Sequence, residues 1–506
     1  MTELARLLAQ ARSKYASLDA VVIDGEAFSY ERLFGIADRL ALRIEALDPG
    51  TAPVAIVARR SLEAYAGVLA AVSLGRPYVP LNVKLPAARK AAIVAMTGCR
   101  IIVSDSQHLP DAAEVASSGG THVIGDIAEM LAPVADDAAR PDPIGDGLPA
   151  YIMFTSGTTG DPKGVIVLRS NLVAYLAAIA TVAPVGVGDR CSQLFDLSFD
   201  LSVHDIFVTL TSGGALYIAG AADELDPVGF AARHKLDCWF SVPSVIGLAK
   251  RMRRLKPASL PDLRLSLFCG EPLSSTLAAE WTRAAPGSRL LNLYGPTEAT
   301  IAITTFELLA DRLPDRAVVP LGLPLPMSDA IAVKDDGEPA AVGETGELWL
   351  AGPQLSAGYF GNPGETARKF VDRRFAGRAF DRWYRTGDIV GFDADDGFLF
   401  QHRLDEQVKL QGYRIDMLEI EEALRSATGT LDVAAIGWPL SETGSAEGIT
   451  GFVTDCGVDD AAVIAGCRSA LPAYMVPQRI IRIGAIPLNA NGKTDRAALR
   501  AFAAVS

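Results

Sequence analysis

The stretch YIMFTSGTTGDPKGV, residues 151–165, joins an apolar strand-like run to a loop rich in hydroxyl groups and glycine. Gly157 and Gly160 let backbone N–H groups approach an anion closely, and Lys163 adds a positive charge. The spacing differs from GxxxxGK[ST], the usual nucleotide-binding loop, because Gly164 and not a hydroxyl residue follows the lysine. By itself the stretch predicts a phosphate-binding loop after a strand, with a flexible turn as the alternative.

Composition limits the classes of protein to consider. The chain has 506 residues, 49% of them hydrophobic, and a formal net charge of -13. This length predicts two or more domains, and the acidic charge disfavours nucleic acid and anionic membranes as partners. The six cysteines show no CxxC spacing, so a disulfide framework or a zinc site is not expected. The charged N-terminus and the lack of a run of about 18 apolar residues predict a cytoplasmic enzyme without membrane insertion.

Short apolar runs alternate with helix-like stretches over most of the chain. The strand-like runs are PVAIVA (53–58), RIIVSD (100–105), ALYIAG (215–220) and RLSLFCG (264–270). The helix-like stretches next to them are SLEAYAGVLAAVSLG, AARKAAIVAMTG, PVGFAARHK and TLAAEWTRAA. This alternation predicts α/β layers with a largely parallel sheet.

The pattern changes after about residue 320. Strand-like pieces separated by Gly and Asp turns, such as ELWLAG, WYRTGDIVGFD and GFLFQHR, predict a β-rich subdomain. Beyond the charged stretch HRLDEQ, helix-like and strand-like runs alternate again, which predicts a C-terminal α+β unit of about 100 residues. We therefore expect an N-terminal core of residues 1–404 and a C-terminal domain of residues 405–506.

Five further stretches follow the hydroxyl-rich loop: FDLSVHDIF (199–207), NLYGPTEAT (292–300), YRTGD (384–388), HRLDEQVKLQGYRID (402–416) and NGKTDR (491–496). Together with that loop they resemble the ordered motifs of the adenylate-forming superfamily. The resemblance is strongest to the amino-acid adenylation domains of nonribosomal peptide synthetases and to D-alanine–carrier protein ligases. It extends from FSYERL (28–33) to NGKTDR and implies a free-standing ligase with a large α/β domain and a small, mobile C-terminal domain.

The resemblance implies that ATP and Mg²⁺ are the cofactors. The implied ATP-binding residues are Thr155, Ser156, Gly157, Thr158, Thr159, Gly160, Lys163, Asn292, Tyr294, Gly295, Asp388 and Arg403. In this family the hydroxyl-rich loop holds the β- and γ-phosphates, the tyrosine lies against the adenine and the aspartate binds both ribose hydroxyls. Thr297 would contact the α-phosphate, and Glu298 would hold Mg²⁺, which prefers oxygen ligands. His402 stands where the family usually has glycine, and no role is assigned to it.

Lys493 of NGKTDR matches the lysine that bridges the substrate carboxylate and the α-phosphate in the family. A cation lowers the barrier when it lies where negative charge develops. The alternative for an isolated Asn-Gly turn is a solvated surface lysine. In relatives the C-terminal domain rotates about a hinge, here Asp405, and replaces this lysine with the segment that contains Lys409 and Gly412. The phosphopantetheine thiol of an acyl or peptidyl carrier protein then accepts the acyl group.

Asp200 of FDLS points to an amino-acid substrate. In amino-acid-activating members this aspartate pairs with the α-ammonium group, and a buried carboxylate without a partner is costly. A helix N-cap is the alternative. The implied pocket lining is Asp200, Leu201, His204, Phe240, Leu267, Cys269, Gly270, Leu293, Ile301 and Ala302. The lining is mostly apolar, and Phe240 and Leu293 should shorten the pocket, so we expect a small apolar amino acid: alanine of either hand, or proline.

Two other functions compete with this prediction. An acyl- or aryl-CoA ligase would not need Asp200. A catalytically silent binding or scaffold protein on the same fold should lack Lys493 or Glu298, and the sequence contains both. We therefore predict ATP-dependent formation of an aminoacyl-AMP and pyrophosphate, followed by transfer to a carrier-protein thiol.

Replacement of the bridging lysine, Lys493→Ala, is expected to abolish adenylation and to leave folding intact, because its charge acts on the reacting groups. ATP–pyrophosphate exchange measures the first effect, and thermal unfolding followed by circular dichroism measures the second. Exchange at the wild-type rate would remove Lys493 from the reaction.

Overall fold

The computed structural model describes residues 2–117, 120–131, 145, 147–155, 162–309, 316–404, 407–410, 412–441, 446–454, 456–488 and 494–505. Seven predicted site residues lie outside these ranges, namely Ser156, Gly157, Thr158, Thr159, Gly160, Asp405 and Lys493.

The chain divides into two compact units. The first consists of Met1–Val83, Ala91–Met153 and Gly164–His402, and the second of Lys84–Lys90, Phe154–Lys163 and Arg403–Ser506. The boundary expected between residues 404 and 405 stays a prediction, because residues 405 and 406 lie outside the described ranges.

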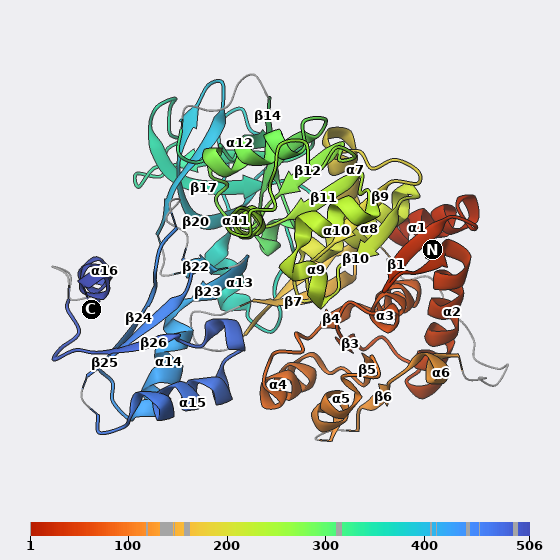
Figure 1. Cartoon of the computed structure of the whole chain (residues 1–506), viewed down its shortest axis with the longest axis horizontal. Helices are drawn as coiled ribbons and strands as arrows, with labels where there is room; N and C mark the ends of the chain where they lie inside the picture. Colours follow the sequence, from red (N-terminus) through yellow and green to blue (C-terminus); the bar gives the residue numbers. More distant parts are fainter. Residues whose placement is uncertain are drawn as a thin grey trace. The chain divides into compact units, whose positions relative to one another are not determined.

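A nine-stranded sheet runs through the first unit (Figure 1). From edge to edge its strands are β15 (Leu323–Pro324), β14 (Thr304–Leu308), β13 (Arg289–Tyr294), β12 (Leu265–Phe268), β11 (Cys238–Ser241), β9 (Arg190–Gln193), β10 (Ala215–Ile218), β1 (Asp19–Ile23) and β2 (Glu26–Ser29). The strands from β13 to β1 run parallel, and β14, β15 and β2 pair antiparallel at the edges. Every residue of β11 and β12 is buried, as in parallel strands with both faces covered. The expected α/β architecture is confirmed.

A seven-stranded sheet contains the strands predicted from PVAIVA and RIIVSD. Its order is β18 (Gly358–Tyr359), β8 (Lys163–Leu168), β7 (Pro149–Thr155), β4 (Tyr78–Pro80), β3 (Val54–Val57), β5 (Ile101–Ser104) and β6 (His122–Ile124). The strand β3 runs parallel to β4 and β5, and β5 runs parallel to β6. The apolar runs are therefore β3 and β5, completely buried strands in the parallel part of a second sheet, whose edge strand β18 pairs antiparallel with β8.

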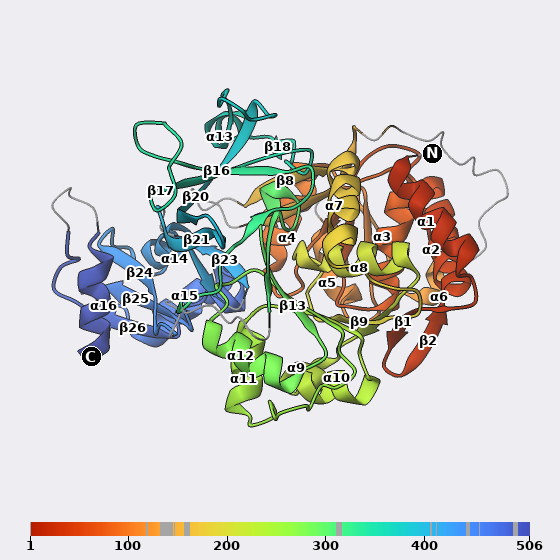
Figure 2. The ribbon, with the colours of Figure 1, turned by 90° about the horizontal axis from the view of Figure 1, so that it is seen from above.

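Helices cover these sheets and include the four predicted above. They are α1 (Glu3–Lys14), α2 (Tyr30–Leu47), α3 (Leu62–Ser73), α4 (Ala87–Thr97), α5 (Leu109–Ala116), α6 (Ile127–Met130), α7 (Arg169–Val182), α8 (Leu201–Ser212), α9 (Ala221–Leu225), α10 (Pro227–His234), α11 (Ser244–Arg251), α12 (Ser275–Ala284) and α13 (Pro363–Lys369). Every residue of α8 from Leu201 to Leu210 is buried, because the helix lies against β9, β10, α1 and α7 (Figure 2). In the described part of the chain, no helix is long and apolar enough to cross a membrane.

The β-rich subdomain expected after about residue 320 is also present. Its strands are β16 (Asp329–Val333), β17 (Thr345–Ala351), β20 (Arg382–Asp393), β19 (Phe370–Asp372) and β21 (Gly397–Arg403). The long strand β20 pairs antiparallel with β17 and β19. Trp349, Phe375 and Trp383 belong to a small core of this subdomain, separate from the main core.

The C-terminal α+β unit is built on strands whose side chains alternate between two faces. Its elements are β22 (Gln407–Leu410), β23 (Tyr413–Asp416), α14 (Met417–Thr428), β24 (Val433–Gly437), β25 (Ile449–Val453), α15 (Asp460–Ala470), β26 (Arg479–Arg482) and α16 (Arg496–Val505). Val433 and Ala435 belong to a core with α14 and α15, whereas Ala434 and Ile436 belong to a core with α16. The sheet β24–β25–β26 is therefore covered on both faces.

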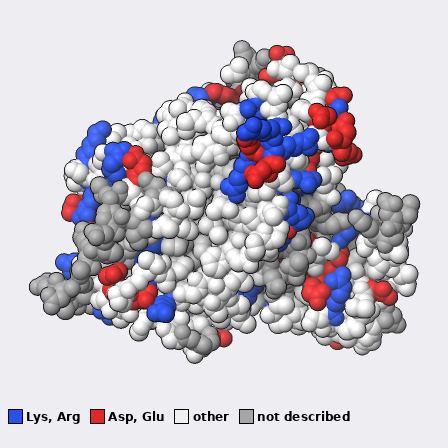
Figure 3. All heavy atoms as spheres, turned by 180° about the vertical axis from the view of Figure 1, so that it is seen from behind, with Lys and Arg blue, Asp and Glu red and all other residues white. Residues whose placement is uncertain are grey.

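Charged side chains on the surface are mixed in sign. On the face in Figure 3, Lys and Arg side chains lie beside Asp and Glu side chains in clusters. Residues 368–385, which include seven Lys and Arg, show the same mixture of signs. Arg374 lies 3.0 Å from Asp381, and Arg378 lies 2.6 Å from Asp329. Basic charge is therefore locally neutralised in this run.

Gly322 connects the nine-stranded sheet to the β-rich subdomain. Its neighbour Leu323 pairs with Thr305 of β14, while the carbonyl oxygen of Gly322 accepts a 2.9 Å hydrogen bond from the backbone N–H of Phe398 in β21. The φ angle of Gly322 is +76°, and a Cβ atom there would lie 1.9 Å from the carbonyl oxygen of Thr305. Glycine is required by both the backbone conformation and the close approach of the two strands.

The variant Gly322→Ala is expected to lower the free energy of unfolding by about 2–4 kcal/mol, because the methyl group meets backbone that cannot move away. Urea unfolding measures the change. The matched control is Gly343→Ala, where φ is +85° but the added methyl group would enter open space. An equal decrease in the free energy of unfolding in both variants would show that the close approach of the strands at Gly322 does not add to the cost of the methyl group.

Candidate active site

The carboxyl ends of β11, β12 and β13 meet at one edge of the nine-stranded sheet. Phe240 lies beside Leu267 across β11 and β12, and Phe268 lies beside Asn292 across β12 and β13. Open α/β sheets bind ligands at the carboxyl ends of their strands. The predicted pocket residues Leu201, Phe240, Leu267, Cys269, Leu293, Ile301 and Ala302 all belong to one buried cluster. Gly270, which follows β12, is half-buried and has a φ angle of +90°.

Asp200 directly precedes α8 and carries a buried carboxylate with an unmatched oxygen. The residue is 8% exposed, and its Oδ2 atom has no hydrogen-bond partner among the described residues. Burial raises the pKa of Asp200 to about 7, although a hydrogen bond from Thr297 lowers it, and the charge of Glu298 raises it further. Asp200 occupies the N-cap position of α8, but within the described chain its side chain makes no capping hydrogen bond to the helix. This carboxylate is suited to a cationic partner.

His204, one turn further along α8, is held between two aromatic rings. Its Nδ1 atom lies 2.6 Å from the hydroxyl of Tyr175, and its ring packs on that of Phe240 with 4.6 Å between centroids. Phe240 in turn packs on Phe195 at 5.1 Å. Burial lowers the pKa of His204 to about 3, so the ring is neutral. Tyr175 was not predicted, because a tyrosine in an apolar helix carries no sequence signal for this contact.

The segment after β13 is a tight loop whose shape depends on glycine. The backbone N–H of Ile303 donates to the carbonyl oxygen of Tyr294 at 2.8 Å, which brings the two ends of the loop together. A Cβ atom on Gly295 would lie 2.6 Å from the Cα of Ala302. The predicted motif NLYGPTEAT therefore places Tyr294 and Gly295 directly against the predicted pocket residues Ile301 and Ala302.

The same loop contains two consecutive residues in the left-handed region. Thr300 has a φ angle of +55° and Ile301 of +75°, which is unfavourable for a β-branched side chain. Gln354 holds this conformation with two hydrogen bonds. Its side-chain Nε2 donates to the backbone carbonyl oxygen of Ala302 at 2.8 Å, and its backbone carbonyl oxygen accepts from the Thr300 hydroxyl at 2.6 Å. Backbone strain of this kind is found at functional sites, where the surroundings impose it.

Glu298, the predicted magnesium ligand, is 1% exposed. Its Oε1 atom accepts a 2.6 Å hydrogen bond from the hydroxyl of Tyr359, a contact that was not predicted. The described residues contain no group of three or more His, Cys, Asp or Glu side chains that could hold a metal alone. Mg²⁺ is commonly bound by one or two carboxylates together with the phosphates of a substrate, so a single glutamate in this position fits the ion.

The residues predicted to bind adenosine lie together in the first unit. The Tyr294 hydroxyl donates to the buried carboxylate of Asp388, and Asn292 donates to the carbonyl oxygen of Pro320 at 2.8 Å. In the described structure, the Asn292 Oδ1 atom is buried without a hydrogen-bond partner. It is therefore available to a donor such as an amino group at a ligand edge.

Glu347 of β17 holds the segment of β20 that carries Asp388, where the register of the two strands shifts. Its carboxylate accepts hydrogen bonds from Arg385 at 2.8 Å, from Trp349 at 3.0 Å and from the backbone N–H of Gly387 at 3.1 Å. Gly387 itself has a φ angle of +78°. The bonds from Arg385 and Gly387 tie Glu347 to the segment of β20 next to Asp388 and fix the position of the aspartate.

The remaining predicted residues belong to the second unit. The Thr155 hydroxyl donates to the carbonyl oxygen of Lys163 at 3.5 Å, and Arg403 donates to Gln407 at 3.1 Å. Lys409 pairs with Arg414 across the hairpin β22–β23, and Gly412 in its turn has a φ angle of +84°. The hairpin thus presents the segment predicted for thiolation.

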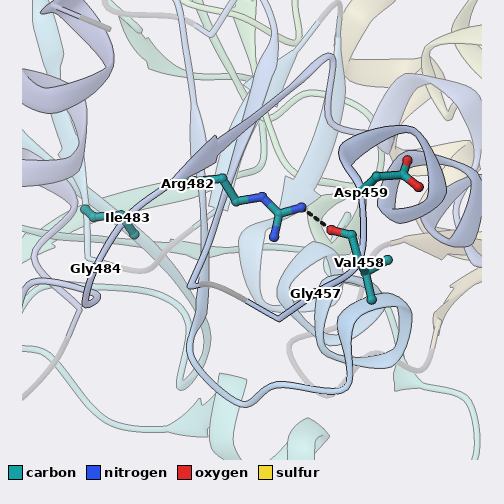
Figure 4. A pocket seen from close by; sticks show the side chains of 6 residues that line it. All are labelled: Gly457, Val458, Asp459, Arg482, Ile483 and Gly484. Carbon is teal, nitrogen blue, oxygen red and sulfur yellow. Dashed lines mark hydrogen bonds between the residues drawn. The ribbon is translucent and has the colours of Figure 1, made fainter.

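A cavity of about 630 Å³ also lies in the second unit, lined by Gly457, Val458, Asp459, Arg482, Ile483 and Gly484 (Figure 4). The Arg482 guanidinium donates to the carbonyl oxygen of Val458 and lies 2.7 Å from Asp460. No predicted site residue lines this cavity.

Two protein-family models match this chain. Residues 8–360 match the family model described as AMP-binding enzyme, and residues 419–493 match the AMP-binding enzyme C-terminal domain. The chain belongs to the AMP-binding enzyme family. The resemblance inferred from the ordered motifs is confirmed, and this AMP-binding enzyme is an AMP-forming ligase.

Individual relatives cover nearly the whole chain. The D-alanine–D-alanyl carrier protein ligase of Bacillus velezensis is 32% identical over 487 residues, which cover 93% of each chain. Novobiocin biosynthesis protein H of Streptomyces niveus is 33% identical over 503 residues, covering 96% of this chain and 80% of that protein. Among solved structures, the Vibrio cholerae adenylation domain AlmE in complex with glycyl-adenosine-5'-phosphate has a TM-score of 0.88 and 32% identity, covering 100% and 98% of the two chains.

The variant Asp200→Asn is expected to be more stable than the wild type at pH 8. A carboxyl whose pKa is raised on folding binds its proton more tightly in the folded state, so stability is lost as the pH rises through the folded pKa of about 7. Between pH 5 and pH 8 the advantage of the variant should grow by about 2–3 kcal/mol. Denaturant unfolding at the two pH values measures it, with Asp395→Asn, at an exposed position, as the control. If the difference in unfolding free energy between the variant and the wild type did not change with pH, the Asp200 carboxylate would not be destabilised by its burial.

Proposed function

We propose that this AMP-binding enzyme activates a small amino acid with ATP, alanine being the leading candidate, and transfers it to the phosphopantetheine thiol of a carrier protein. The observation that carries the proposal is the buried Asp200 carboxylate, whose Oδ2 atom has no hydrogen-bond partner among the described residues. An α-ammonium group supplies both the positive charge and the hydrogen-bond donors that this oxygen lacks.

The position of Asp200 next to Thr297 also fits an α-amino acid. Thr297 is close enough to lower the pKa of Asp200 by hydrogen bonding, and it is the residue predicted to contact the α-phosphate. In an α-amino acid a single carbon separates the ammonium group from the carboxylate. Anchoring the ammonium group at Asp200 therefore directs the carboxylate toward Thr297, where attack on the α-phosphate would occur.

The aromatic cluster beside Asp200 favours a short substrate side chain. His204 and Phe240 are 4% and 3% exposed and pack directly on each other. Both are predicted pocket residues, so their bulk leaves little depth. The names of the relatives agree with this size, because one acts on D-alanine and another was solved with a glycyl-adenylate. Alanine is therefore placed first, with glycine and proline as alternatives.

The other predicted residues of the proposed reaction have the following roles. Tyr294 and Asp388 form a hydrogen-bonded pair suited to a nucleoside, since the carboxylate can accept from both ribose hydroxyls. Glu298 would hold Mg²⁺, which when bound to ATP neutralises phosphate charge. Lys493 would bridge the carboxylate and the α-phosphate, and Lys409 and Gly412 would form the thiolation face.

An acyl-CoA ligase is the second candidate, because it would use the same nucleotide-binding residues. Its substrate has no ammonium group, so the unmatched oxygen of Asp200 would stay buried without a partner. This energetic cost disfavours the second candidate.

ATP–pyrophosphate exchange across both alanine enantiomers, glycine, serine, L-proline and simple acids tests the proposal. We expect strong exchange with alanine and a KM for the amino acid at least about tenfold higher in Asp200→Asn, because the charge-assisted contact is lost. A phosphopantetheinylated carrier protein should then become aminoacylated, as measured by mass spectrometry. Exchange confined to acids without an amine would instead identify an acyl ligase.

A further inference from the structure

Tyr175 lies behind the predicted amino-acid pocket but is not one of its predicted lining residues. It is located on α7, it is completely buried, and its hydroxyl forms the 2.6 Å hydrogen bond to Nδ1 of His204. Its electrostatic neighbours include Cys269 and Asp200, which places the phenol close to the predicted pocket. A single hydroxyl therefore connects α7 to the wall on which the substrate side chain would rest.

The two rings that contact His204 restrict it in different ways. The Phe240 ring packs against one side at 60° to the imidazole, which limits where the ring can move but not which nitrogen it presents. The Tyr175 ring lies at 66° to the imidazole with 5.9 Å between centroids, so its main interaction is the hydrogen bond. That hydrogen bond selects one rotamer and one orientation of the histidine.

Breaking this contact would leave two polar atoms buried. Both side chains are neutral, because burial lowers the pKa of His204 to about 3 and raises that of Tyr175 well above its ordinary value. A His204 ring that moved aside for a larger substrate would lose its partner in an environment without water. The penalty falls on large side chains and leaves a small substrate unaffected.

We infer that Tyr175 is a positioning residue that limits the size of the amino-acid side chain by holding the His204 ring across the floor of the pocket. The inference rests on the proposed function, and it deepens that function by naming what restricts the substrate to a small side chain. Tyr175 acts through His204 and does not itself need to touch the substrate.

The conservative variant Tyr175→Phe tests this inference, because it keeps the ring and removes only the hydroxyl. ATP–pyrophosphate exchange would be measured with alanine, 2-aminobutyrate and valine, which differ by single carbons. We expect the ratio of kcat/KM for 2-aminobutyrate to that for alanine to rise at least about fivefold, mainly through the KM for 2-aminobutyrate. Tyr65→Phe is the matched control, since Tyr65 is equally buried, lies on α3 and lacks a hydrogen-bond partner among the described residues.

A double-mutant cycle separates positioning through His204 from a general loss of packing. His204→Ala should widen the substrate range by itself, and adding Tyr175→Phe to it should leave the ratio unchanged. Thermal unfolding of each variant confirms that it is folded.

Failure of the role of Tyr175 and failure of amino-acid activation give different results. An unchanged ratio in a folded Tyr175→Phe enzyme that still activates alanine would overturn the role of Tyr175 alone. Equal shifts in Tyr175→Phe and Tyr65→Phe, or additive effects with His204→Ala, would also overturn it. Failure of the wild type to exchange with any amino acid would overturn the proposed function and the inference built on it.

Discussion

The buried carboxylate of Asp200 is the constraint on which the site depends. Asp200 and Glu298 are both almost inaccessible to water. The negative charge of Glu298 is close enough to raise the pKa of Asp200. Glu298 is stabilised by the hydroxyl of Tyr359. Asp200 keeps an oxygen without a protein partner in the described structure, so the free protein carries an electrostatic cost that a cationic ligand removes.

The surrounding scaffold is rigid because unfavourable backbone conformations are held by side chains from other segments. Gln354 forms hydrogen bonds to the segment that contains the left-handed residues Thr300 and Ile301. Glu347 accepts a hydrogen bond from the backbone of Gly387, next to Asp388 in β20. The Gln354 support joins the segment after β17 to the loop after β13, and the Glu347 support joins β17 to its neighbour β20. A strained loop with such supports keeps its polar groups in place without a ligand, which lowers the reorganisation needed for reaction.

Much of the fold was predictable because its strands are local apolar runs. PVAIVA, RIIVSD, ALYIAG and RLSLFCG became β3, β5, β10 and β12. The strand-like pieces separated by Gly and Asp turns after about residue 320 also predicted the β-rich sheet. In contrast, the sequence placed Asp200 at the N-cap position of α8 but could not show that its side chain makes no capping hydrogen bond there, because capping depends on the rotamer.

The sequence by itself determined the fold class, the family and the type of reaction, since these follow from short motifs and from hydrophobic periodicity. The tertiary structure decided which carboxylate oxygen stays without a partner among the described residues, which hydroxyl stabilises Glu298 and which hydroxyl bonds to His204. Tyr175 and His204 are 29 residues apart, and Tyr359 and Glu298 are 61 apart. Desolvation and hydrogen-bond partners depend on every segment packed around a group, and only the folded chain brings those segments together.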